Sequence, residues 1–180
     1  MEPWNLGTFG QMYSSGVTKR QRTFEWEEPT PFRHRGEGKP GLELLRLAVA
    51  GVFPPPPMAM LMDIRLTEID KGRAVFTGTP QEFHYNPLGT VHGGFGATLL
   101  DSAMGCAVHS TLDAGDIYTT LEFKINFMRP LTHETGVVRA MGTVINATRT
   151  TAVAEGRIED GEGRIYAFAT ATCVIRRAGT

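Results

Sequence analysis

The sequence predicts an α+β domain in which an antiparallel β-sheet wraps around one central helix. Three observations predict this fold. A nearly uncharged segment is typical of a long buried helix, two strand-like pieces precede it, and four strand-like pieces follow it. Consecutive strands joined by tight turns pair antiparallel, and a helix that is apolar on all sides has to be covered by other elements.

The central helix is expected at residues 93–110. From Phe83 to Leu112 the only formal charge is that of Asp101, and the residues of the expected helix are apolar or small all round. A membrane span is the alternative for such a segment. The glycines and polar residues within it, and the strands on both sides, favour burial inside a domain and argue against a membrane span.

Shorter elements are expected ahead of this helix. A helix over residues 41–52 should end at four consecutive prolines, Pro54 to Pro57, which form a rigid turn. Strands at residues 62–69 and 73–79 then form a hairpin, and residues 80–91 form a loop.

Four strands are expected after the helix, at residues 117–127, 137–145, 152–158 and 164–176. In the first of them, strict alternation assigns one buried face to Ile117, Thr119, Leu121, Phe123, Ile125 and Phe127. In the last, the expected buried set is Ile165, Ala167, Ala169, Ala171, Cys173 and Ile175. Together these elements predict a single domain over residues 41–180.

Residues 1–40 differ from the rest and are expected to form an N-terminal extension or arm. They hold 11 charged residues and four prolines, and they show no helical or strand period. Six aromatic residues argue against a purely solvated tail. Two interpretations stay open: an arm that docks on the domain or on a second subunit, and a mobile extension with a few aromatic anchors.

Composition excludes several classes of function. With 18 basic and 19 acidic side chains the net charge is -1, so no broad basic field exists for nucleic acid. Two cysteines are too few for a disulfide framework or a Cys-rich zinc site, and no cluster has metal-ligand spacing, so no metal or cofactor is expected. The N-terminus shows no signal peptide, which predicts a cytoplasmic location.

The stretch from Asn86 to Gly94 is the first part of a candidate site. Gly93 and Gly94 stand where the central helix starts, and a helix N-terminus offers unpaired N–H groups. Without side chains there, a developing oxyanion such as a polarised thioester carbonyl could reach those groups. Close packing is the alternative explanation. His92 either lies beside the reacting group or, the favoured interpretation, bonds the backbone to shape the turn.

Asp101 is the stronger signal, because a lone carboxylate in a buried helix is costly unless it is hydrogen-bonded or paired. Helical geometry places it on one face with Gly94, Ala97, Thr98, Met104, Gly105 and Val108, opposite the expected core set Phe95, Leu99, Ala103 and Cys106. A second subunit or a substrate would fill the space beside it. The alternative is a structural carboxylate bonded to Thr98 or to a neighbouring strand.

Two segments, NPLGTVHGGFGATLLDSA (residues 86–103) and TTLEFKINFMRPL (residues 119–131), resemble the hotdog-fold acyl-CoA thioesterases, in particular the phenylacetate-pathway (PaaI-like) group. The resemblance covers roughly residues 58–178. It implies a hotdog fold, a homodimer or a tetramer built from two dimers, and hydrolysis of an aromatic, medium-chain or long-chain acyl-CoA without a cofactor. Two alternatives are a hotdog hydratase or dehydratase and a non-catalytic acyl-CoA-binding sensor.

The resemblance also implies roles for individual residues. Gly93 would donate its backbone N–H to the thioester carbonyl. Asp101, from the other subunit, would act as general base on water or as nucleophile. Asn86 would orient the water or the thioester, and His92 would shape the loop and hold Asn86.

Further residues are carried over in the same way. A Ser or Thr on the strand after the helix often assists the acid; Thr119 and Thr120 point to opposite faces, and Thr120 is preferred. Gly94 and Thr119 are expected to contribute to substrate binding. Arg129 and Arg149 could meet the phosphates of coenzyme A, or could be solvated arginines in turns.

Overall fold

The computed structural model describes residues 18–28 and 38–179. Within them a single six-stranded antiparallel sheet has the order β1-β2-β4-β5-β6-β3. The strands are β1 (Ile64–Asp70), β2 (Arg73–Gly78), β3 (Ile117–Phe127), β4 (Val138–Ala147), β5 (Thr151–Glu159) and β6 (Ile165–Arg176). The helices are α3 (Gly41–Val49), α4 (Pro57–Met62) and α5 (Gly93–His109), with short 3₁₀ turns η1 (Glu82–His84) and η2 (His133–Thr135).

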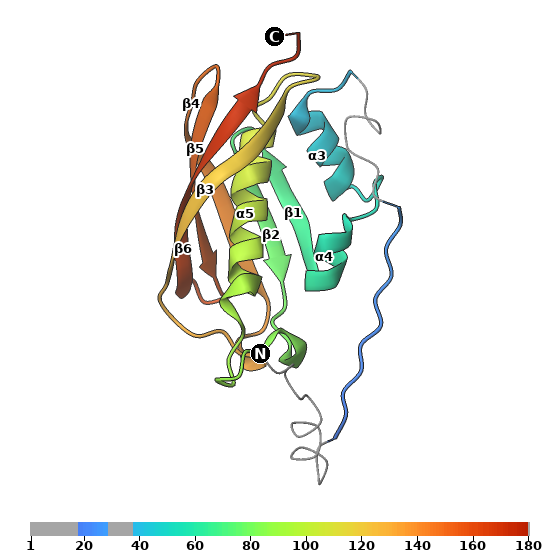
Figure 1. Cartoon of the computed structure of the whole chain (residues 1–180), viewed down its shortest axis with the longest axis vertical. Coiled ribbons are helices and arrows are strands. Elements are labelled where there is room, and N and C mark those ends of the chain that lie inside the picture. Colours follow the sequence, from blue (N-terminus) through green and yellow to red (C-terminus); the bar gives the residue numbers. More distant parts are fainter. Residues whose placement is uncertain (1–17, 29–37, 180) are drawn as a thin grey trace, which may run out of the picture.

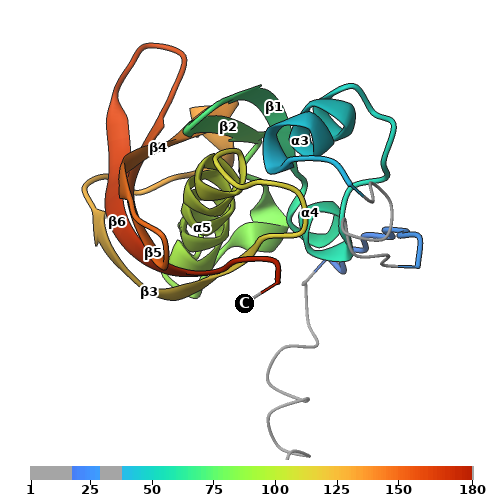
Figure 2. The same cartoon turned by 90° about the horizontal axis from the view of Figure 1, so that it is seen from above.

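The sheet curls around helix α5, as the sequence predicts (Figures 1 and 2). Viewed along the helix, strands surround it on most sides, while α3 and α4 lie next to β1 on the side that the strands leave open (Figure 2). Strand β3 pairs with β6 at one edge of the sheet and is not a neighbour of β4. The chain therefore crosses from one edge to the interior of the sheet between these two strands.

Helix α5 and the sheet approach each other closely because glycine occupies the contact points. A Cβ added to Gly142 on β4 would lie 2.4 Å from the carbonyl carbon and oxygen of Ala103. A Cβ on Gly156 of β5 would lie 3.1 Å from side-chain atoms of Leu100 and Met104. The sheet therefore packs directly against the backbone of the helix.

This enclosure corrects part of the predicted helical faces. Phe95, Leu99 and Ala103 are buried as expected, but so are Met104 and Val108, which were expected beside Asp101. Conversely, Cys106 was expected in the core and is half-buried. Because the sheet wraps more than one side of the helix, the core takes up a wider arc than a helix lying on a flat sheet would bury.

Strand β3 contradicts the predicted alternation. Its pairing register with β6 shifts between Thr120 and Glu122, which marks a β-bulge at Leu121. Ile117 and Leu121 are exposed, while Tyr118 and Thr120 are half-buried. The predicted inward set is therefore wrong for Ile117, Thr119, Leu121 and the exposed Phe127, and right for Phe123 and Ile125. In β6, the exposed Ile165 is the one wrong member of the predicted set.

The elements ahead of α5 differ in detail from the prediction. Helix α3 ends at Val49, before the prolines, and the strand expected from residue 62 begins at Ile64. The sequence predicts only a rigid turn at the prolines, whereas in the structure the last of them, Pro57, begins helix α4. Proline is well suited to the first turn of a helix because the N–H that it lacks would have no partner there.

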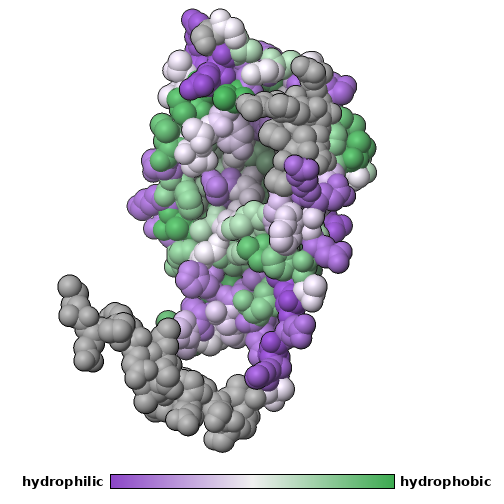
Figure 3. Space-filling view, turned by 45° about the vertical axis from the view of Figure 1, so that its right-hand side comes forward, coloured by the Kyte–Doolittle hydropathy of each residue, from purple (hydrophilic) through white to green (hydrophobic). Residues whose placement is uncertain are grey.

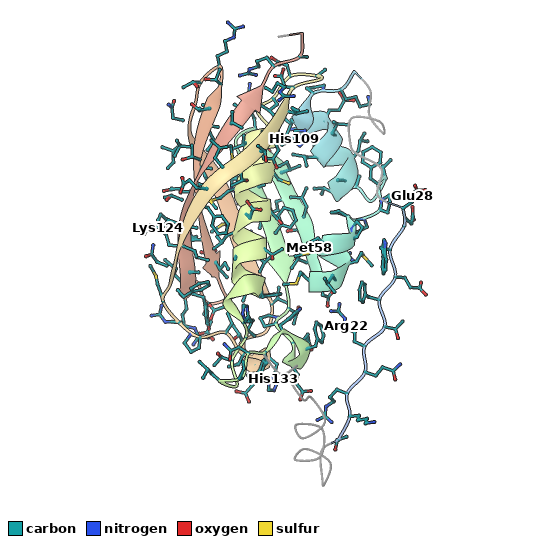
Figure 4. All side chains as sticks on the ribbon, in the orientation of Figure 1. Arg22, Glu28, Met58, His109, Lys124 and His133 are labelled. Carbon is teal, nitrogen blue, oxygen red and sulfur yellow. The ribbon has the colours of Figure 1, made fainter. Side chains whose placement is uncertain are left out.

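Residues 18–28 run in an extended path along α4 and η1, and we call this segment the strap (Figure 4). Arg22 donates to the carbonyl oxygens of Leu61 (2.7 Å) and Met60 (3.2 Å) at the end of α4. Its guanidinium also stacks 3.9 Å from the centre of the Phe83 ring. This part of the N-terminal region therefore contacts the domain, whereas residues 1–17 and 29–37 lie outside the described residues.

We predict that Gly142→Ala destabilises the protein by about 1–3 kcal/mol, because the added methyl group meets the backbone of α5, which cannot move without disturbing the core. Chemical denaturation with both proteins in the same buffer measures the loss. Gly161→Ala is the matched control, since a Cβ at that position has no atom within 4 Å. Equal losses in the two variants would contradict the close approach.

Candidate active site

The loop before α5 is held together by Asn86. Its Oδ1 accepts from the backbone N–H of Leu88 at 2.8 Å, and its Nδ2 donates to Thr90 Oγ1 at 3.2 Å. The backbone N–H of Asn86 also donates to the carbonyl oxygen of Thr90. The side chain thus shapes the loop, and its described hydrogen bonds go to residues of the loop and none of them to His92.

His92 caps the N-terminus of α5. Its Nδ1 accepts a 2.9 Å hydrogen bond from the backbone N–H of Gly94. A nitrogen that accepts carries no proton, so the ring proton of neutral His92 lies on Nε2. The cap uses the Gly94 N–H, and the N–H of Phe95 donates to the carbonyl oxygen of His92.

Gly93 is left with an unused donor. Its N–H has no hydrogen-bond partner among the described residues, although those of the two residues that follow are both used. Gly93 lines a cavity of about 450 Å³ that also exposes Phe127, Arg129 and Tyr166. An N–H at the positive end of a 17-residue helix, open to a cavity, is a ready donor for an oxyanion.

Tyr166 is fixed in this cavity by Asp160. The buried carboxylate accepts from Tyr166 Oη at 3.1 Å and from Arg164 Nε at 2.7 Å. Burial acts to raise the pKa of Asp160, but these bonds and those from the backbone N–H groups of Arg164 and Glu162 outweigh it and hold the pKa at about 2. The carboxylate is therefore charged at neutral pH.

Asp101 lies on the half-buried side of α5 and is paired with β3. Thr120 Oγ1 donates to Asp101 Oδ1 at 3.0 Å, and the Cys173 thiol donates to Thr120 Oγ1 at 3.9 Å. Thr119 faces the other side of the sheet and is exposed. The bulge in β3 thus brings Thr120 to the acid, and the pairing occurs within one chain.

The acid and Thr120 line a second cavity, of about 290 Å³. Cys106 lines it too, but burial, helped by the nearby Asp101 carboxylate, raises the pKa of the thiol to about 12. The thiol therefore stays protonated and is a poor nucleophile at neutral pH. Asp101 is the acidic group available for chemistry in this cavity.

The two candidate groups do not meet within one chain. Gly93 and Asp101 are eight residues apart on one helix, which separates them by about 12 Å along its axis. They also line different cavities. Reacting atoms have to come within about 3–3.5 Å of each other, so one chain cannot apply both groups to the same carbonyl.

The two arginines lie at opposite ends of the domain. Arg129 lines the Gly93 cavity and donates to the carbonyl oxygen of Ile165 at 2.6 Å. Arg149 lies in the β4–β5 turn, and its carbonyl oxygen accepts a hydrogen bond from Arg177 Nε. This turn is at the end of the domain where α5 has its C-terminus (Figure 1). Within one chain, therefore, Arg129 lies beside the cavity of Gly93 and Arg149 lies far from it.

Two further features bear on the kind of site. In residues 18–28 and 38–179, no group of three or more His, Cys, Asp or Glu side chains could hold a metal ion. In the same residues, no helix is long and apolar enough to cross a membrane.

Sequence reasoning missed Tyr118 and Tyr166. Tyr118 lines the Asp101 cavity, and Tyr166 lines the Gly93 cavity. For Tyr118 a signal existed: it stands two residues before Thr120, and alternate residues of a strand share a face. Tyr166 has no such signal, because its partner Asp160 sits in a turn.

Comparison with known proteins places the chain among thioesterases. Residues 88–167 match the profile of the Thioesterase superfamily. A Saccharolobus solfataricus protein whose name assigns it to the esterases is 31% identical over 116 residues, which is 64% of this chain and 81% of that protein. The 1,4-dihydroxy-2-naphthoyl-CoA hydrolase of Listeria monocytogenes is 24% identical over 63% of this chain and 91% of its own length.

Solved structures agree with this placement. A phenylacetic acid degradation-related protein of Ralstonia eutropha JMP134 superposes with a TM-score of 0.65 at 26% identity, covering 72% of this chain and 97% of that one. A mutant form of the phenylacetic acid degradation protein PaaI of Thermus thermophilus gives a TM-score of 0.60 at 28% identity, covering 66% of this chain and 98% of that one.

The chain belongs to the thioesterase superfamily. It is a thioester hydrolase with the hotdog fold, and its structural relatives include PaaI proteins.

We predict that His92→Ala lowers the free energy of unfolding by about 1 kcal/mol, because the Gly94 N–H loses its cap. His92→Asn should keep most of the stability, since asparagine is among the best N-cap residues. Urea denaturation of the three proteins measures both effects. The cap would be unimportant if the alanine variant were as stable as the wild type.

Proposed function

We propose that the protein is an acyl-CoA thioesterase whose active site is shared between two subunits. Gly93 of one subunit would bind the thioester carbonyl, and Asp101 of the partner subunit would activate water. The observation that carries this proposal is the placement of an unused N–H donor and a cavity-lining acid about 12 Å apart on one rigid helix.

A symmetric pair of α5 helices would bring the two groups together. Ala97 is midway between Gly93 and Asp101, and on the half-buried side of the helix it is flanked by the small residues Gly94 and Thr98. Two helices that cross antiparallel around Ala97 would place each Gly93 opposite the other subunit's acid. Small side chains permit the close approach, and a two-fold axis generates two equivalent sites per dimer.

The chemistry then follows from these positions. Asp101 removes a proton from a water molecule as the oxygen of that water attacks the thioester carbon. The carbonyl oxygen becomes an oxyanion, which is held by the Gly93 N–H and the helix dipole. When the tetrahedral intermediate collapses, the C–S bond breaks and the thiolate takes the proton back from Asp101. The Thr120 hydroxyl orients the carboxylate, and Asn86 orients the water or the thioester.

Attack by the carboxylate itself is the other route. It would give an enzyme-bound anhydride, which water would then hydrolyse. The hydrogen bond from Thr120 leaves Asp101 Oδ2 without a partner in the described residues, so this oxygen serves either role. We favour the general base, because it needs one nucleophilic step rather than two.

Two observations and one general principle support coenzyme A as the thiol. The Listeria relative is named a CoA hydrolase, the Gly93 cavity opens beside Arg129, and a cationic side chain suits a phosphate. Arg149, Gly94 and Thr119 are kept as lesser candidates for binding in the assembled protein. We propose a cytoplasmic homodimer or a tetramer of two dimers, which acts without metal and does not bind nucleic acid.

We predict that Asp101→Asn lowers kcat for acyl-CoA hydrolysis at least about 100-fold, because the amide cannot accept the proton from water. Release of free thiol from a panel of aromatic and aliphatic acyl-CoAs measures it. Asp113→Asn, an exposed acid in the turn after α5, is the matched control and should keep wild-type rates. Undiminished turnover in Asp101→Asn would exclude this acid from catalysis.

We also predict that two inactive variants complement each other in mixed dimers. Gly93→Pro removes the donor N–H at the first helical position, where proline fits and where the preceding His92 is already extended (φ -61°, ψ 137°). A heterodimer of Gly93→Pro and Asp101→Asn subunits has one intact site, so purified heterodimers should show about half of the wild-type activity.

The control for this experiment is Gly93→Ala, which adds the same Cβ beside Phe127 but keeps the N–H. It should be more active than Gly93→Pro. Heterodimers as inactive as the two parents would show that each chain carries a complete site, and would overturn the shared site.

A further inference from the structure

The cavity beside Asp101 is walled by the chain's own N-terminal elements. On the side facing α5 it exposes Ser102 and Cys106, and on the β3 side Tyr118. The opposite wall comes from Leu45 and Ala48 of α3, from Phe53 and the prolines 54–56, and from Met58 and Ala59 of α4. In the sequence, the residues of this wall precede the segment 88–167 that matches the thioesterase superfamily.

The wall is held in place from outside. Arg22 of the strap bonds to two carbonyl oxygens at the end of α4, the helix that carries Met58 (Figure 4). Three consecutive prolines allow little backbone movement between α3 and α4. The surface on this side of the molecule carries hydrophobic and hydrophilic residues side by side (Figure 3). The cavity is thus a fixed and mostly apolar space with an acid on one side.

Tyr118 contributes a polar group to this space, as do Arg65, Asp101, Ser102 and Thr120. Its ring lies over Gly105 so closely that a Cβ on that glycine would be 2.6 Å from the hydroxyl oxygen. The hydroxyl has no hydrogen-bond partner among the described residues. Burial, with smaller contributions from Cys106, Cys173 and Asp101, raises the pKa of Tyr118 well above its usual value, so the hydroxyl stays neutral and can donate.

The position of this hydroxyl suggests what it contacts. Gly105 is one helical turn beyond Asp101, about 6 Å further along the axis. A cavity of about 290 Å³ is at the small end of the range for ligand pockets, about 300–1,000 Å³, and suits a single ring better than a long chain. A ring attached to a carbonyl at Asp101 would extend toward Tyr118.

We propose that Tyr118 is a specificity-determining residue: it hydrogen-bonds a hydroxyl or carbonyl substituent at the far end of a ring-sized acyl group held in the Asp101 cavity. This inference rests on the proposed thioesterase function and deepens it. An acyl group without the substituent would displace water from the hydroxyl and leave it without a partner, which penalises that substrate.

The test compares benzoyl-CoA with its 3-hydroxy and 4-hydroxy derivatives. The wild type should prefer the better hydroxylated thioester by about 10- to 100-fold in kcat/KM. In Tyr118→Phe this ratio should fall to near one, and Gly105→Ala, which displaces the hydroxyl, should also reduce it. Tyr85→Phe removes a hydroxyl that bonds His133 outside both cavities, and should leave the ratio unchanged.

Binding to the Asp101→Asn protein gives a readout that does not need turnover. Calorimetry should show the same preference for the hydroxylated thioester, lost when Tyr118→Phe is added. Two results would overturn the inference: a wild-type kcat/KM ratio of hydroxylated thioester to benzoyl-CoA near one, or a large ratio that survives in Tyr118→Phe. In both cases the observed hydrolysis would still uphold the proposed function. Hydrolysis of none of the thioesters would overturn the proposed function, and the binding preference would then decide the role of Tyr118 alone.

Discussion

The architecture depends on the close approach between helix α5 and the elements around it. The helix is apolar or small around most of its circumference, so it has to be enclosed, and enclosure at backbone distance requires glycine at the contacts. Gly142 admits the backbone of Ala103, and Gly105 admits the ring of Tyr118. The same device operates at the start of the helix, where Gly93 leaves its N–H open to a cavity. Packing and the proposed function thus both depend on glycine at these positions.

The sequence is sufficient to predict this helix, the antiparallel sheet and the location of the acid, because each is a local pattern. The inward face of β3 is not predictable in the same way. The residues that alternation would bury, Ile117 and Leu121, are apolar but exposed, and a one-residue bulge reverses the faces. The residues that face inward there, Tyr118 and Thr120, line a cavity, so hydrophobicity is a poor guide where the strand contributes to the candidate site.

Other features depend on contacts between residues far apart in sequence. Helix α4 begins at a proline that also ends a run of prolines, and only its packing shows that the residue starts a helix. The contact of Arg22 with the end of α4 joins residues almost 40 positions apart, and nothing in the local pattern of the strap indicates it. The pairing of Asp101 with Thr120 spans 19 positions and needs the bulge as well. The resemblance to a known family led to Thr120 as the residue that assists the acid, and strand geometry alone could not have chosen it over Thr119.

Under the proposed function, the rigid helix also means that association of two subunits has to bring the donor and the acid together. A 17-residue helix buried along most of its length cannot bend to bring its first residue to its ninth. No motion within one chain would close the distance of about 12 Å between donor and acid. Catalysis therefore becomes a property of the pair of subunits: each contributes an oxyanion donor to one site and an acid, with its acyl cavity, to the other. The acyl group and the carbonyl oxygen of a single substrate would then be recognised by different chains, so a change in the acyl wall of one subunit would alter the site completed by the Gly93 of its partner.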